Sequence, residues 1–186
     1  MKIALTGAHG VGKSTLANFL KTEIDKKAIS VSITPEVPRL ICDAVNNNEY
    51  FRRGRNSLLK QSLILIGQLV IEEHLRKDGV IQICDRTLLD HWAYSLNLFG
   101  KEIEEGHYTE IYETFISTHC ASYDKIFYIP IEFKPVDDGV RESDEIFQSK
   151  IDKSILDLLI KHKIEFQTIT GSIKTRGETI LKYINL

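Results

Sequence analysis

The chain has 186 residues, which is enough for one hydrophobic core but short for two independent domains, and no linker rich in proline, glycine or serine divides it. A hydrophobic content of 42% and a charged content of 27% argue against extensive disorder. The formal net charge of −2 argues against a strongly basic surface, so no nucleic-acid polymer is expected as a partner. We therefore expect one domain over residues 1–186.

Five short runs rich in apolar and β-branched residues predict buried parallel strands, because each is mostly apolar throughout rather than alternating. They are Lys2–Thr6, Ile29–Thr34, Val80–Cys84, Lys125–Ile129 and Ile164–Ile169. Helical periodicity fills intervals between them, over Lys13–Lys26, Asn56–Asp78, Leu88–Phe99 and Ser143–His162. This alternation predicts an α/β protein with a five-stranded, mostly parallel sheet between two helical layers, and ligand sites at the carboxyl ends of the strands.

The first predicted strand is followed by a glycine-rich motif, Gly7-Ala8-His9-Gly10-Val11-Gly12-Lys13-Ser14-Thr15, which matches G-x-x-x-x-G-K-[ST] at every fixed position. Its glycines let successive backbone N–H groups face phosphate oxygens, and the following helix adds the positive end of its dipole. We expect Lys13 to bridge the β- and γ-phosphates of ATP, Ser14 to bind Mg²⁺ and Thr15 to lie near the α-phosphate. His9 is interpreted as a variable loop position. The motif predicts a three-layer P-loop NTPase fold.

Asp85 and Arg86 stand at the carboxyl end of the third predicted strand. An acidic residue there can hold Mg²⁺ directly or through water, so Asp85 is the Walker B candidate. Many P-loop hydrolases carry a second carboxylate at the next position, which orients water. Arg86 cannot activate water but can pair with a phosphate, which favours phosphoryl transfer over hydrolysis.

The stretch from Asp85 to Tyr94, D-R-T-L-L-D-H-W-A-Y, resembles the D-R-x-x-[DS]-x-x-A-Y segment of thymidylate-kinase-like proteins and of NadR-like P-loop kinases of the AAA_28 family. Asp90 matches the second group better. The resemblance implies that Arg86 contacts the transferred phosphate or an acceptor phosphate, and that Asp90 and Tyr94 face the acceptor pocket. For Trp92 and Tyr94, plain helix packing is the alternative.

The second predicted strand ends in Thr34-Pro35-Glu36-Val37-Pro38-Arg39, which resembles the P-E-x-x-R segment of NadR-like kinases. The resemblance makes Glu36 the candidate general base toward a ribose hydroxyl and Arg39 a residue that orients the acceptor. In the alternative interpretation, Glu36 caps a helix and Arg39 pairs with it.

Two later segments complete the resemblance. Residues 135–142 resemble the D-D-G-x-R lid of NadR-like kinases, which implies a lid at about 133–145, with Arg141 as an internal arginine finger, or else a solvated loop. The turn at Gly171, with Arg176 beyond it, stands where P-loop kinases contact adenine. There, an ordinary turn glycine and an exposed helix residue are slightly favoured.

The cysteines and the first residues predict a cytoplasmic protein that does not contact a membrane. Cys42, Cys84 and Cys120 are odd in number and widely spaced, which predicts reduced thiols rather than disulfides or a zinc site. Met1 precedes a strand without signal-peptide features, and the longest apolar stretch is interrupted by polar residues. The basic cluster at Arg52, Arg53 and Arg55 is either a solvated loop or a contact for an anionic substrate.

The order of these motifs predicts an ATP-dependent kinase with Mg²⁺ and a small-molecule acceptor. The acceptor would be a nucleoside or nucleoside monophosphate, with nicotinamide riboside or a deoxynucleotide among the candidates. The alternative is a regulatory or switch NTPase without such an acceptor, although no guanine-reading [NT]-K-x-D segment is present. The acceptor, the pathway and the oligomeric state, a homodimer included, are left open by the sequence.

Overall fold

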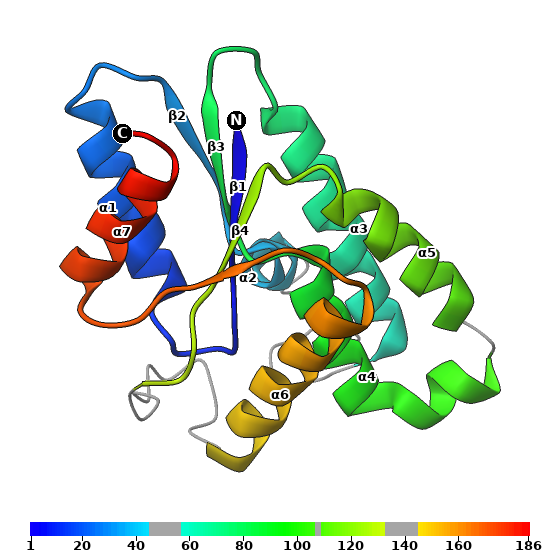
Figure 1. Ribbon diagram of the computed structural model, residues 1–186. Helices are drawn as coiled ribbons and strands as arrows, with labels where there is room; N and C mark the ends of the chain where they lie inside the picture. The colour runs from blue at the N-terminus through cyan, green and yellow to red at the C-terminus, as the bar shows by residue number, and fades with distance from the viewer. Residues whose placement is uncertain (45–56, 107–108, 133–144) are drawn as a thin grey trace.

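The computed structural model describes residues 1–44, 57–106, 109–132 and 145–186 (Figure 1). The lid with Arg141 and the cluster of Arg52, Arg53 and Arg55 lie outside these ranges, and so does the side chain of Arg39.

A parallel sheet of five strands forms the centre of the described structure, in the order β2-β3-β1-β4-β5. The strands are β1 (Lys2–Thr6), β2 (Val31–Thr34), β3 (Ile81–Asp85), β4 (Lys125–Tyr128) and β5 (Gln167–Thr168). β1 is buried along its whole length, because strands pair with it on both sides and helices cover both faces. The predicted α/β fold with a five-stranded sheet is confirmed.

Helices cover the two faces of the sheet unequally. They are α1 (Lys13–Asp25), α2 (Val37–Ala44), α3 (Leu58–Leu75), α4 (Leu88–Glu105), α5 (Thr109–Cys120), α6 (Glu145–Lys161) and α7 (Ile173–Tyr183). In Figure 1, α1 and α7 lie together on one side of the sheet, and α3, α4, α5 and α6 lie on the other. None of the helices in the described ranges is both long and apolar enough to cross a membrane.

The helical ranges predicted from the sequence omit three helices, α2, α5 and α7, although Arg176 of α7 is interpreted there as a helix residue. α2 has eight residues and carries Pro38 at its second position, which obscures a helical pattern. Proline is nevertheless tolerated in the first turn, where its missing N–H would have no partner within the helix. α5 contains several β-branched residues of weak helical propensity and packs against α4, so its tertiary contacts supply what the local sequence does not.

α4 continues beyond the point where its pattern predicts an end. The sequence places the end at Gly100, but the helix runs to Glu105, with a kink at Phe99, whose φ of −137° and ψ of 27° are not helical. Gly100 therefore follows a bend rather than ending the helix. Ile103, beyond the bend, is fully buried, which explains why the last turns stay against the core.

The register of the sheet brings the predicted site residues to one edge. Leu5 of β1 lies opposite Asp85 of β3, and Thr6 lies opposite Tyr128 of β4. Thr34, the last residue of β2, pairs with Cys84 of β3. The segments that follow β1, β2, β3 and β4 therefore begin side by side, and this carboxyl edge carries the phosphate loop.

Candidate active site

The phosphate loop, residues 7–15, holds all three of its glycines at positive φ, and two of them show why larger residues would not fit. Gly7 has a φ of +143°, and a Cβ atom there would lie 2.4 Å from the carbonyl oxygen of Ile129. Gly12 caps α1 in a left-handed conformation with a φ of +89°. Larger residues would therefore displace the loop from β4 at its start and strain the backbone at its end.

Lys13 lies inside this loop and is only 4% exposed. Its Nζ donates to the carbonyl oxygens of Gly7, at 2.6 Å, and of Ala8, at 2.5 Å. Burial, and secondly the positive charge of Arg86, lower the pKa of Lys13 to about 7. The ammonium thus occupies the concave side of the loop, where phosphate oxygens could replace the two carbonyls as its partners.

Ser14 and Asp85 meet at the entrance of the loop, where the Ser14 hydroxyl donates to Oδ2 of Asp85 at 2.5 Å. These two oxygen groups fit the preference of Mg²⁺, which usually takes one or two protein ligands together with phosphate oxygens and water. Within the described ranges, no group of three or more His, Cys, Asp and Glu residues is arranged to hold a metal. Mg²⁺ bound here would therefore depend on oxygens of the nucleotide.

Arg86 and Glu36 come together although 50 residues separate them, with Nη2 of Arg86 donating to Oε1 of Glu36 at 2.8 Å. The structure thus gives Glu36 an ion pair with Arg86. Arg86 also has a φ of +97°, a strained backbone conformation for a residue with a side chain. Gln68 of α3 donates to the Arg86 carbonyl at 3.3 Å and helps to hold this conformation.

Asp90 lies beneath the phosphate loop and is fully buried. Its carboxylate accepts from the N–H of Gly7 at 3.0 Å, the hydroxyl of Thr6 at 2.9 Å, and both the N–H and the hydroxyl of Thr87. With Thr87 it forms a capping box that begins α4. The resemblance implied an acceptor-side position for Asp90, whereas these donors turn its carboxylate toward the end of β1 and the start of the loop.

The aromatic residues of α4 divide between the core and the site. Trp92 is fully buried and stacks on Tyr112 with ring centroids 4.6 Å apart, as the packing alternative expected. The hydroxyl of Tyr94 lies 2.7 Å from Nδ1 of His9, and the Tyr94 ring lies 5.5 Å from the guanidinium carbon of Arg86. Tyr94 therefore touches both the loop and the Asp85-Arg86 segment.

At the predicted adenine side, the expectation of an exposed Arg176 is wrong, because Arg176 is fully buried. Its Nη1 donates to the Val11 carbonyl in the phosphate loop at 2.8 Å, and its Nη2 lies 2.5 Å from Oε2 of Glu132. Both oxygens of Glu132 also accept from the N–H of Gly171, at 3.0 and 2.9 Å. The sequence-based reasoning missed Glu132, although its place just beyond β4 follows the rule that functional residues stand after strand ends.

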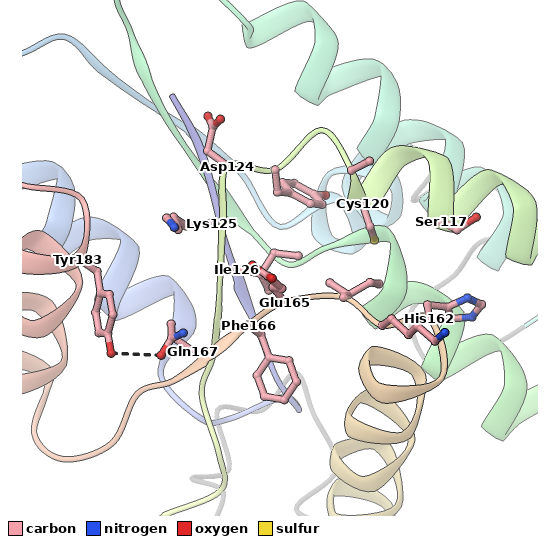
Figure 2. A pocket seen from close by; sticks show the side chains of 14 residues that line it. Ser117, Cys120, Asp124, Lys125, Ile126, His162, Glu165, Phe166, Gln167 and Tyr183 are labelled. Carbon is pink, nitrogen blue, oxygen red and sulfur yellow. Dashed lines mark hydrogen bonds between the residues drawn. The ribbon is translucent and has the colours of Figure 1, made fainter.

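A separate hollow of about 380 Å³ lies at the opposite edge of the sheet (Figure 2). It is bordered by the starts of β4 and β5, with Asp124, Lys125 and Gln167 among its lining residues, and by Tyr183 of α7. Acidic and basic side chains are mixed there, and Tyr183 donates to Gln167 at 3.1 Å. None of the residues that line the hollow belongs to the phosphate loop, so the hollow is separate from the proposed nucleotide site.

Comparisons with known proteins agree with the fold. The model of a family described as an AAA domain, AAA_28, matches residues 2–176. Deoxyadenosine kinase from M. mycoides with bound dATP is similar in structure, with a TM-score of 0.73 and 20% identity over all of both chains. NadR in complex with NAD and AMP-PNP is similar with a TM-score of 0.73 and 13% identity, and the match covers all of this chain and 49% of the NadR chain. Thymidylate kinase from Ehrlichia chaffeensis is similar with a TM-score of 0.69 and 17% identity, and the match covers 99% of this chain and 98% of the thymidylate kinase chain. Sequence comparison with curated proteins finds no match.

Proposed function

The chain belongs to the AAA_28 family, and on that basis we propose that it is an ATP-dependent phosphotransferase for a small nucleoside or nucleoside monophosphate. The observation that carries this proposal is the meeting of two pairs at one edge of the sheet. Ser14 pairs with Asp85 on the donor side, and Arg86 pairs with Glu36 beside them. A cation and a carboxylate next to a phosphate loop are the groups that transfer to a hydroxyl requires.

On the donor side, residues 7–15 would bind the phosphates of ATP through backbone N–H groups and the α1 N-terminus. Lys13 would exchange its carbonyl partners for oxygens of the β- and γ-phosphates. Ser14 and Asp85 would hold Mg²⁺, which would neutralise charge on the phosphates. The turn at Gly171 would contact the adenine base.

On the acceptor side, Glu36 would accept the proton of the attacking hydroxyl, and Arg86 would stabilise negative charge on the moving phosphoryl group. In the structure their ion pair holds the two groups together, so acceptor binding would have to loosen it. Tyr94 and Arg39 are proposed to border the acceptor, and Arg141 of the expected lid is proposed to act as an internal arginine finger toward the transferred phosphoryl group. For Asp90 we propose support of the loop in place of direct substrate contact, because protein donors surround its carboxylate.

The proposal is tested by incubating the protein with ATP, Mg²⁺ and a panel of nucleosides and nucleoside monophosphates, with products identified by mass spectrometry. We expect one class of acceptor to be phosphorylated and ATP consumption to depend on it. Equal ATP consumption without acceptor, and no phosphorylated product, would instead support the regulatory NTPase. Nicotinamide riboside and the deoxynucleosides belong in the panel, since the family-level resemblance does not choose between them.

Glu36→Gln tests the proposed base. Loss of a general base costs about 10²-fold or more in transfer rate, and ATP affinity should stay close to that of the wild type. The rate is measured by single turnover with the best acceptor, and the affinity by calorimetry. Unchanged turnover would remove Glu36 from this role. Glu73→Gln, at an exposed glutamate of α3, is the matched control.

A further inference from the structure

Glu132 and Arg176 join three segments that surround the proposed nucleotide site. Arg176 comes from the first turns of α7, Glu132 from the chain just beyond β4, and their further partners are Gly171 and Val11. Val11 and Arg176 are 165 positions apart. The roles proposed above for the phosphate loop and for the acceptor-side residues do not involve Glu132 or Arg176.

The two side chains form a directional link rather than a simple ion pair. The planar guanidinium of Arg176 divides its donors between the Val11 carbonyl, at 2.8 Å, and the Glu132 carboxylate, at 2.5 Å. The hydrogen bond from Arg176 holds the pKa of Glu132 below its ordinary value, so Glu132 is charged at neutral pH. Glu132 in turn accepts the N–H of Gly171, whose φ of +97° suits glycine.

The link also orients the phosphate loop. Because a trans peptide is planar, its C=O and the following N–H point in opposite directions. By fixing the Val11 carbonyl toward α7, Arg176 therefore turns the N–H of Gly12 away from α7. Gly12 is the residue that immediately precedes α1, where backbone N–H groups are free to bind an anion.

We propose that Glu132 and Arg176 are positioning residues that hold the base-binding turn at Gly171 at a fixed distance from the phosphate loop. An adenine nucleotide that spans this distance then meets a preformed site at both of its ends, which saves the cost of ordering them on binding. The inference rests on the proposed ATP binding, and it deepens the proposed function by assigning part of the ATP affinity to residues that touch neither the transferred phosphoryl group nor the acceptor.

Glu132→Gln is the principal test, because the Glu132 side chain is 26% exposed and glutamine has nearly the same size, and thermal unfolding checks the fold of the variant. We expect the dissociation constant for ATP to rise about tenfold, as for the loss of one charge-assisted hydrogen bond. The KM for ATP should rise in parallel, whereas kcat and the KM for the acceptor should change little. Glu178→Gln is the matched control on α7, since Glu178 is exposed and pairs loosely with Lys174 at 3.8 Å.

Arg176→Lys supplies a second variant that keeps the charge but replaces the two-pronged guanidinium with a single point donor. Its effect on ATP affinity should not add to that of Glu132→Gln in the double variant, because both break the same link. Affinity is measured by calorimetry without acceptor, and thermal unfolding checks the fold.

The outcomes separate this inference from the proposed function. Wild-type protein that fails to bind ATP would overturn both. Wild-type protein that binds ATP, with Glu132→Gln binding equally well, would overturn the positioning role alone. A loss of kcat with an unchanged KM for ATP would also overturn it, because that pattern belongs to a residue that acts in the transition state.

Discussion

The two ends of the central sheet both bury charged side chains, but they hold them in different ways. At the amino end, β1 begins with Lys2, whose Nζ lies 2.7 Å from Oε2 of Glu72. Glu72 also accepts from Tyr123 at 2.9 Å and lies 2.7 Å from Nε2 of His119. We call Lys2, Glu72, His119 and Tyr123 the amino-end cluster. At the carboxyl end lies the phosphate loop (Figure 1).

The two ends differ in the groups that bind their buried charges. The oxygens of Glu72 are surrounded by side chains of the protein, Gln68 at 2.6 Å included, so the cluster satisfies its charges internally. At the carboxyl end, Lys13 uses backbone carbonyls, and the loop keeps a conformation that requires glycine. Buried charge alone therefore does not identify a functional site. What distinguishes the carboxyl end is a cation whose present partners can be exchanged for phosphate oxygens.

The strongest test of this comparison is Lys13→Met. At the carboxyl end we expect the transfer rate to fall by about 10³-fold or more, as when a group that stabilises transferring phosphate is removed. The melting temperature should be equal to or higher than that of the wild type, because burial already opposes the charged form of Lys13. Single-turnover transfer and thermal unfolding measure the two effects. Near-normal transfer would contradict the assigned role.

The opposite result is expected at the amino end for Glu72→Gln. Removal of one member of a buried charged group leaves Lys2 without its countercharge, which lowers the free energy of unfolding by about 3 kcal/mol. The KM for ATP should be unchanged. Chemical denaturation measures the first quantity and steady-state kinetics the second. The neighbouring exposed Glu73→Gln is the control, and equal stability of the two variants would show that the cluster contributes nothing.

The same variant predicts a change in acid stability. Burial raises the pKa of Glu72, but the His119 hydrogen bond and the charge of Lys2 lower it, and together they outweigh the effect of burial. The pKa of Glu72 in the folded protein therefore lies below its ordinary value of 4.5. The stabilisation is therefore present above pH 4.5 and is lost as the pH falls below it. Unfolding midpoints of wild type and Glu72→Gln should converge in acid. A constant difference across the acid range would contradict this assignment.

The sequence is sufficient for the parts of the site that follow local rules. The spacing of Gly7, Gly12 and Lys13 predicts the phosphate loop, and an apolar strand before Asp85 predicts its place beside that loop, as the sheet register confirms. Both signals lie within a few consecutive residues, where backbone geometry and strand order determine the outcome.

The missed features depend on distant partners. Arg176 looks like a surface residue in its own helix, and its burial is explained by two distant partners, Val11 and Glu132, which lie 165 and 44 positions away. The Asp90 carboxylate is similarly held by hydrogen bonds from Thr6 and Gly7, which lie 84 and 83 positions away in the sequence. A single sequence carries no local pattern for such pairs, so it shows which residues can do chemistry but not whether they contact the substrate or support the loop.

The finest test of the comparison uses the titration of Lys13. Its pKa of about 7 in the unliganded protein should rise when phosphate oxygens surround it, so ATP binding takes up a proton above that pH. Affinity should then weaken by up to about tenfold per pH unit between about pH 7 and 9. Calorimetry in two buffers of different ionisation enthalpy measures the proton uptake. Lys13→Arg keeps its charge throughout, so its affinity should stay flat over this range, and the same slope in both proteins would assign the proton to another group.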